Sequence, residues 1–170
     1  MDSFEDDIHG KVKEPYKVSH ESVFKNPDTH KEVVRMLKSV TKAGGTSEKA
    51  AVRGFEVAGK TGTANKIVNG RYVVGKYFAS FCGFIPADAP RIVVVITCDE
   101  PSGDKLYGGS TSGPAFARIA QRVLQYMDVP LDMTPEQWDQ MMKDARKQSI
   151  ADMKKRENDR RRSLGIAPLQ

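Results

Sequence analysis

The side chains best suited to chemistry stand together at Lys60, Thr61, Gly62 and Thr63, at the end of an apolar run that is typical of a buried strand. A lysine offers a fixed positive charge that can pair with a carboxylate. Threonine hydroxyls can donate hydrogen bonds to the same group. A glycine has no Cβ, so a peptide can lie close against the strand there. Together these residues could hold a carboxylate and stabilise an oxyanion.

This run needs structural context, because a given tripeptide occurs by chance in roughly one chain in fifty of this size. Taken alone, the four residues favour a strand end that is followed by a polar turn. The neighbouring elements therefore decide whether the run is a binding site.

The pattern of apolar residues predicts an antiparallel sheet with helices packed on it, which is an α+β fold. Apolar residues at helical spacing indicate a helix over residues 29–42. A strand is expected over residues 55–64, and the runs 77–84 and 91–98 flank a short Pro/Asp turn that is typical of a β-hairpin. A second helix is expected over residues 114–127, with its proline in the first turn.

Three further features refine the predicted sheet. Asn69 and Gly70 predict a tight turn after the first strand. Residues 92–96 are apolar at every position, which indicates a strand that is covered on both faces. Asp99 and Glu100 are adjacent at a strand end, so we expect their carboxylates to point to opposite faces.

The last part of the chain predicts a separate, basic helix. Thr134 and Gln137 form a capping box around Pro135. Apolar residues then give the helix one face for three turns: Trp138, Met141, Met142 and Ala145. Between Lys143 and Ser163 nine Lys/Arg stand against four Asp/Glu, a surplus of five that equals the whole net charge of +5. The sequence leaves open whether the distal end is a solvated helix or irregular, and whether the apolar face packs on the domain or on a partner protein.

Composition excludes several other classes of protein. A length of 170 residues allows one domain with an apolar core. No stretch has the roughly 18 apolar residues of a membrane span. The acidic N-terminus lacks the apolar segment of a signal peptide. The basic segment has no aromatic residues arranged for stacking, so nucleic-acid binding is not expected.

Cysteine and histidine usage predicts neither a disulfide framework nor a metal site. Cys82 and Cys98 lie in apolar runs, where a free buried thiol is the commoner state, although a disulfide between them stays open because the sequence does not fix the register. His9, His20 and His30 lack the spacing and partners of metal ligands. No cofactor is predicted.

Residues from about Val33 to Val129 closely resemble the C-terminal part of the transpeptidase domain of class B penicillin-binding proteins, which have a serine β-lactamase-like fold. The matching pieces stand in the family's order and cover more than half of the chain. They are Gly44-Gly45-Thr46, residues 57–64, residues 79–91, Asp99-Glu100-Pro101, Tyr107-Gly108-Gly109 and Pro114-Ala115-Phe116.

This family has three active-site motifs, S-x-x-K, S-x-N and K-T-G, and only the third is securely matched here. The three S-x-x-K matches begin at Ser22, Ser39 and Ser102, which precede the wrong helix, end a helix, or follow K-T-G. No S-x-N occurs. We therefore expect the chain to be the later part of a transpeptidase domain, without its nucleophile half and inactive alone.

The resemblance implies a peptidoglycan D,D-transpeptidase, in which a serine attacks the D-Ala-D-Ala amide of a stem peptide and β-lactams mimic that substrate. It implies that Lys60, Thr61, Gly62 and Thr63 bind the substrate and that Lys60 and Thr63 also serve catalysis, with the Thr63 N–H as one of two oxyanion donors. The substrate would add along the strand as an extra strand. The family works on the extracytoplasmic side of the bacterial cytoplasmic membrane.

These arguments predict three parts: an irregular segment over residues 1–28, the C-terminal portion of a transpeptidase domain over 29–130, and a helical basic extension over 131–170. The implied partners are stem peptides and β-lactams, bound together with the missing half of the domain. The basic tail could also contact an anionic membrane surface. An alternative hypothesis is a non-catalytic remnant that acts as a binding or scaffold module through its basic C-terminal helix.

Overall fold

The computed structural model describes residues 5–6, 10–11, 22–102 and 106–169, and the chain divides into two units at residues 30 and 31. In the first unit β1 (Glu5–Asp6) and β2 (Gly10–Lys11) form a short antiparallel ladder. Most of the segment predicted to be irregular, and with it His9 and His20, lies outside the described residues. The division of the chain at residues 28 and 130 stays a prediction.

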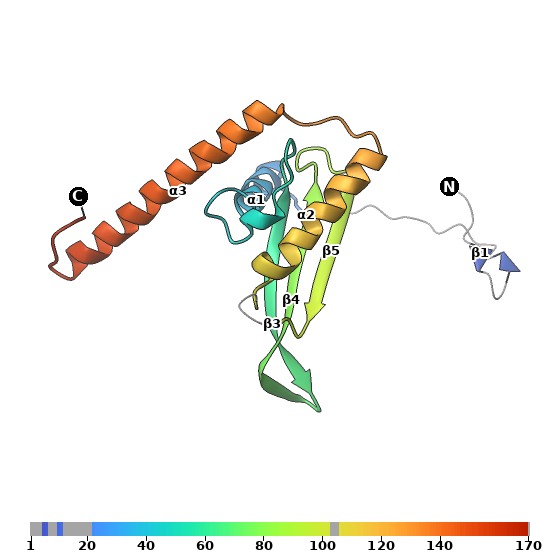
Figure 1. The fold of residues 1–170 in the computed structure, drawn as a ribbon, viewed down its shortest axis with the longest axis horizontal. Coiled ribbons are helices and arrows are strands. Elements are labelled where there is room, and N and C mark those ends of the chain that lie inside the picture. Colours follow the sequence, from blue (N-terminus) through green and yellow to red (C-terminus); the bar gives the residue numbers. More distant parts are fainter. Residues whose placement is uncertain (1–4, 7–9, 12–21, 103–105, 170) are drawn as a thin grey trace. The chain divides into compact units, whose positions relative to one another are not determined.

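The second unit is built on a three-stranded antiparallel sheet in the order β3 (Ala58–Val68), β4 (Arg71–Ile85) and β5 (Ile92–Asp99). The predicted turn joins β3 to β4, with positive φ at Asn69 and Gly70. This tight turn lets the two strands pair further than the predicted ranges, and the hairpin extends past the end of β5 (Figure 1). The predicted α+β fold and its strand connections are confirmed.

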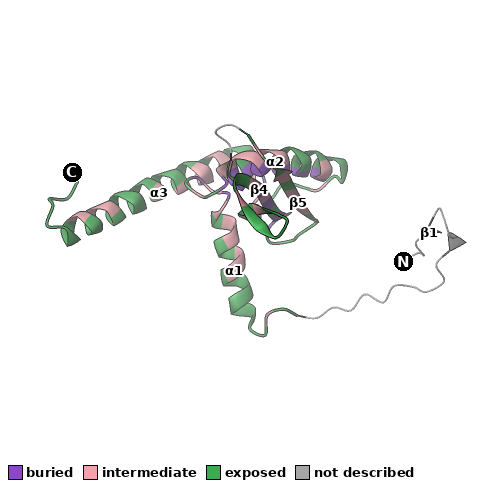
Figure 2. Cartoon of the chain, turned by 90° about the horizontal axis from the view of Figure 1, so that it is seen from below, coloured by how far each residue is buried: buried purple, intermediate pink, exposed green. Residues whose placement is uncertain are grey.

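One face of the sheet is covered by α2 (Gly108–Tyr126), and the buried core lies between them (Figures 1 and 2). Phe81 of β4 meets Phe116 of α2 edge to face, with ring centroids 4.8 Å apart. The core consists of Ala50, Val52, Phe55, Val57, Phe81, Ile85, Phe116, Ala120 and Leu124. Burying an aromatic or aliphatic side chain of this kind stabilises the fold by about 1.5–3 kcal/mol.

The prediction that residues 92–96 are covered on both faces is wrong for the described residues. Burial alternates along β5: Val94 and Ile96 are half-buried, whereas Val93 is 69% and Val95 is 63% exposed. Among the described helices, α2 alone contacts the sheet. No described helix covers the second face of the sheet, and Val93 and Val95 are exposed there.

Both predicted domain helices form, with shifted ends. The first, α1 (Pro27–Ser39), begins and ends earlier than expected. The second, α2, begins at Gly108 rather than Pro114, so the proline lies inside the helix. Gly108 and Gly109 stand before the predicted start of this helix but lie inside it, and Gly109 is tightly packed, because a Cβ there would lie 2.1 Å from the carbonyl oxygen of Thr46.

The C-terminal helix α3 (Pro135–Ser163) has the predicted capping box. The Gln137 N–H donates to Thr134 Oγ1 at 3.3 Å, and the Thr134 N–H donates to Gln137 Oε1 at 2.8 Å. The helix continues through the basic segment, which is solvent-exposed over most of its length (Figure 2). No helix in the described ranges is both long and apolar enough to cross a membrane.

Both cysteines are free thiols. Cys82 pairs across from Val95 and Cys98 from Ala79, so the two thiols lie on opposite faces of the sheet. Cys82 is exposed, contrary to the expectation of a buried thiol, because it lies on the uncovered face.

The base of the β3–β4 hairpin is tied to the end of β5. Lys66 Nζ lies 2.9 Å from Asp99 and 2.7 Å from Glu100. The expectation that these carboxylates point to opposite faces is therefore wrong. Glu100 has a φ of 47°, and this left-handed turn brings its side chain back beside Asp99.

Candidate functional site

The four predicted site residues lie near the start of β3, and the register places them on both faces of the strand. Lys60 pairs with Cys82 and Gly62 with Ser80, on the face away from α2. Thr61 and Thr63 alternate with them and face α2. Among the described strands β3 is an edge strand, so one side of its backbone is open to an extended peptide.

Lys60 presents an exposed ammonium group on this edge strand. Its Nζ donates to the carbonyl oxygen of Thr61 at 2.9 Å. It forms no ion pair with any carboxylate in the described part of the chain. The positive charge is therefore available to an anionic ligand.

The two threonine hydroxyls are in contact with groups on the α2 side. Thr61 Oγ1 lies 3.4 Å from Thr46 Oγ1. The Gly108 N–H, at the start of α2, donates to Thr63 Oγ1 at 3.5 Å. Because the Thr63 oxygen accepts this bond, its own hydrogen can be donated elsewhere. The N-terminus of α2 also adds positive potential at this point.

The start of α2 approaches the strand closely because it begins with glycine. A Cβ on Gly108 would lie 2.0 Å from the Ser80 carbonyl oxygen and 2.7 Å from that of Gly62. Real Cβ contacts are never this short, so a side chain here would push the helix away from Gly62 and Ser80. Gly108 is part of the family resemblance, but this role depends on backbone contacts that the sequence does not show.

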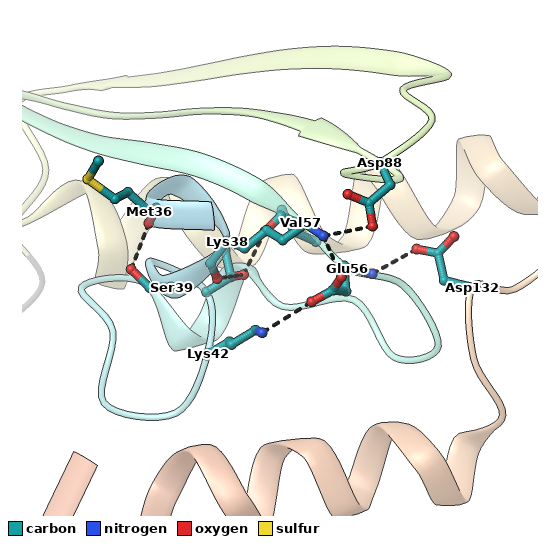
Figure 3. A network of polar contacts seen from close by, with 9 residues as sticks. Met36, Lys38, Ser39, Lys42, Glu56, Val57, Asp88 and Asp132 are labelled. Carbon is teal, nitrogen blue, oxygen red and sulfur yellow. Dashed lines mark hydrogen bonds and ion pairs between the residues drawn. The ribbon is translucent and has the colours of Figure 1, made fainter. Parts of the chain in front are cut away.

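A polar network holds the residues that lead into β3 (Figure 3). Glu56 accepts from Lys38 Nζ at 2.7 Å and pairs with Lys42 Nζ at 3.1 Å. Lys38 also lies 2.7 Å from Asp88, in the β4–β5 turn. The Glu56 N–H donates to Asp132 Oδ2 at 2.9 Å. This network has no signal in the sequence, because its members come from separate elements and share no spacing.

The network shifts the ionisation of its two central groups. Burial acts to raise the pKa of Glu56, but hydrogen bonds from Lys38 and Lys42 hold it below its ordinary value. Burial acts to lower the pKa of Lys38, but hydrogen bonds to Asp88 and Glu56 hold it above its ordinary value. Both groups are therefore charged across the neutral pH range.

The backbone around Glu56 is also held directly. The Ala87 N–H donates to the Glu56 carbonyl oxygen at 2.9 Å. Thr41 Oγ1 donates to the Val57 carbonyl oxygen at 3.0 Å. The backbone just before β3 is thus held in place by hydrogen bonds from two other segments.

Two serines of the three S-x-x-K matches donate their hydroxyls to backbone carbonyl oxygens close to them in the chain. Ser39 Oγ, at the end of α1, donates to the Met36 carbonyl oxygen at 2.6 Å, while Lys42 pairs with Glu56 (Figure 3). Ser22 Oγ donates to the Phe24 carbonyl oxygen at 2.8 Å. The lysine that follows Ser102 lies outside the described residues. In the described ranges, no three His, Cys, Asp or Glu side chains gather as metal ligands.

Comparison with known proteins identifies the family that this strand and sheet resemble. The family model "Penicillin binding protein transpeptidase domain" matches residues 2–121. The probable peptidoglycan D,D-transpeptidase PenA of Neisseria flavescens is 48% identical over 101 residues, which are 59% of this chain and 25% of PenA. The peptidoglycan D,D-transpeptidase FtsI of Escherichia coli K12 is 43% identical over 101 residues, 59% of this chain and 17% of FtsI.

Solved structures agree with these matches. The transpeptidase domain of Burkholderia pseudomallei penicillin-binding protein 3 aligns with a TM-score of 0.60 and 40% identity, covering 77% of this chain and 37% of that one. Penicillin-binding protein 3 of Mycobacterium tuberculosis, solved with ampicillin, aligns with a TM-score of 0.55 and 35% identity, covering 64% and 26%. The chain spans a quarter or less of the length of the two D,D-transpeptidases, PenA and FtsI.

Proposed function

Because this chain belongs to the penicillin-binding protein transpeptidase family, we propose that residues 60–63 are the family's K-T-G strand end. In this role they bind the terminal carboxylate of a peptidoglycan stem peptide, and of the β-lactams that mimic it. The observation that carries the proposal is an edge strand that presents an ammonium group with no carboxylate partner in the described ranges. The family's location, outside the bacterial cytoplasmic membrane, is part of the same proposal.

Each residue has a chemical role in this proposal. Lys60 supplies the positive charge that attracts the carboxylate. The hydroxyls of Thr61 and Thr63 donate hydrogen bonds to it, and Gly62 lets the peptide approach the backbone. The N–H of Thr63 is one of two oxyanion donors, each of which contributes roughly 10²–10³ in rate.

We place the nucleophilic serine outside these 170 residues. The sequence has no S-x-N, and the hydroxyls of Ser22 and Ser39 donate to backbone carbonyl oxygens close to them in the chain. The uncovered sheet face supports the same view, because Val93 and Val95 are exposed where a further layer of the domain would cover them. The 170 residues alone should therefore not be acylated.

Labelling with a fluorescent penicillin tests this proposal. The 170-residue chain alone is expected to take no covalent label. The native polypeptide that contains these residues is expected to be labelled on a serine outside them. Replacing Lys60 with alanine should reduce that labelling strongly, whereas Lys76→Ala, on the same hairpin and paired with Glu100, should not. A labelled serine within residues 1–170 would contradict the proposal.

The distal part of α3 favours a second candidate function, as a binding module for an anionic partner such as a membrane surface. It is an exposed helix that extends away from the sheet and carries Arg160, Arg161 and Arg162 in its last turn (Figure 1). Co-sedimentation with phosphatidylglycerol vesicles, compared with neutral phosphatidylcholine vesicles, tests it. Binding to the anionic vesicles that is lost in the triple Arg→Ala variant would support this candidate, and no binding would exclude the membrane.

A further inference from the structure

Several residues after α2 contact residues 44–57, the segment that leads directly into β3. We infer that residues 131–149 form a C-terminal clamp that positions the K-T-G strand. The inference rests on the proposed function of that strand. The clamp lies beyond residues 2–121, which the family model matches.

The first part of the clamp binds backbone groups just before the strand. The N–H groups of Asp132 and Met133 both donate to the Gly54 carbonyl oxygen, at 3.0 and 3.2 Å. The Asp132 carboxylate accepts from the Glu56 N–H at 2.9 Å (Figure 3). Leu131 packs against Gly54, where a Cβ would lie 2.8 Å from Leu131 Cδ2.

The second part consists of anchors along one side of α3. Asp139 pairs with Arg53 at 2.6 Å, and Arg146 pairs with Glu48. Ser149 lies against the loop at residue 44, where a Cβ on the glycine would fall 1.9 Å from Ser149 Oγ. Positions 139, 146 and 149 share one side of a helix, so α3 can make these contacts together.

Apolar packing closes the space between the helix and the segment. Trp138, Met141 and Met142 face Phe55 and Val57 across a cavity of about 10 Å³. A buried water needs roughly 10–15 Å³. The space left between these side chains is therefore no larger than about one water molecule, whereas a wider groove of about 1010 Å³ lies beside it, between α3 and residues 35–45.

These contacts can act on the site because only a few residues of the chain separate the two. Glu56 precedes Lys60 by four residues, which is roughly 13 Å of extended strand. Its backbone N–H is held by Asp132, while its carbonyl oxygen is held by Ala87. A shift of the clamp therefore moves the point from which β3 starts, and with it the ammonium and hydroxyl groups further along.

Hydrogen exchange on the 170-residue chain tests the clamp without any requirement for activity. Asp132→Ala is expected to speed exchange of the amides in residues 55–64 by about tenfold, since it removes a charged hydrogen-bond acceptor. Residues 92–98 of β5 should be unchanged. Asp132→Asn keeps an acceptor oxygen and should restore protection. Asp152→Ala is the matched control, because among the described residues that carboxylate bonds within α3, to Gln148. Unchanged exchange at residues 55–64 in Asp132→Ala would overturn the inference.

Acylation of the native polypeptide gives a second measurement, which a purely structural role would not alter. Asp132→Ala is expected to lower the acylation rate constant several-fold with little change in the noncovalent dissociation constant for penicillin, and Asp132→Asn should rescue it. If Lys60→Ala abolishes acylation but Asp132→Ala leaves it unchanged, the clamp is wrong and the proposed function stands. If Lys60→Ala keeps full acylation, the proposed function fails, and hydrogen exchange still decides whether the clamp exists. Should Asp132→Ala fail to fold, Asp139→Ala removes a surface anchor and is expected to show a smaller change in the same direction.

Discussion

Residues 54–57 and residues 60–63 are neighbouring segments that differ in whether their charged and backbone groups have partners. In the first, Glu56 has lysine partners on its side chain and hydrogen bonds at both its N–H and its carbonyl oxygen. In the second, Lys60 reaches only a neighbouring carbonyl oxygen in the described structure, and its strand edge is unpaired. A charged group whose partners are complete holds the fold, whereas one that lacks a counter-charge can bind a ligand. The comparison separates the support of this site from the site itself.

The largest expected effect lies in the open stretch. Lys60→Ala should lower the second-order rate constant for penicillin acylation of the native polypeptide by about 100-fold, because the carboxylate loses its charge partner. Its melting temperature should hardly change, since no described carboxylate depends on this ammonium. Stopped-flow acylation and a thermal melt measure the two quantities. A variant that melts much earlier, with normal acylation, would reverse the roles assigned to the two stretches.

The next largest effect lies in the closed stretch and should appear in stability. Glu56→Ala leaves Lys38 and Lys42 without their shared carboxylate, and we expect the free energy of unfolding to fall by about 2 kcal/mol. Urea denaturation of the 170-residue chain measures this change. Glu32→Ala is the control, because its ion pair with Arg35 is fully exposed and should matter much less. Equal losses of unfolding free energy in the two variants would mean that the network stabilises the fold no more than a surface ion pair does.

The fold can be predicted largely from local signals in the sequence, whereas the support of the site depends on contacts between distant residues. Apolar runs and the Asn69–Gly70 turn were enough to predict three antiparallel strands, because those signals are local. The start of α2 was missed, since Gly108 and Gly109 suggest a loop unless their contacts with Ser80 and Thr46 are known. The network around Glu56 cannot be predicted from the sequence for the same reason, because its members come together only in the folded chain.

The pH dependence of stability gives a smaller, signed effect. The pKa of Glu56 is lowered in the folded state, so its contribution is present above its ordinary pKa of 4.5 and is lost as pH falls through the folded value. The pKa of Lys38 is raised, so its contribution is present below 10.5 and is lost as pH rises through the folded value. Glu56→Gln should therefore flatten the acid side of the stability profile. An unchanged acid side would contradict this assignment.

The smallest expected effect concerns the surface beside the open stretch. Cys82 lies across from Lys60 on the uncovered face, while Cys98 contacts Ser112 on the α2 face. A thiol reagent should label Cys82 of the 170-residue chain several-fold faster than Cys98, because access controls the reaction. Mass spectrometry of the Cys82→Ser and Cys98→Ser variants distinguishes the two sites. Faster labelling of Cys98 would show that the faces are assigned the wrong way round.

In the proposed function, the open edge of β3 holds the carboxylate of a bound substrate. A crystal structure of the native polypeptide acylated by a penicillin tests it most directly. We predict that the drug's carboxylate lies within hydrogen-bonding distance of the Thr61 or Thr63 hydroxyl, near Lys60, with the acyl oxygen at the Thr63 N–H. An acylated drug whose carboxylate points away from β3 would contradict the claim.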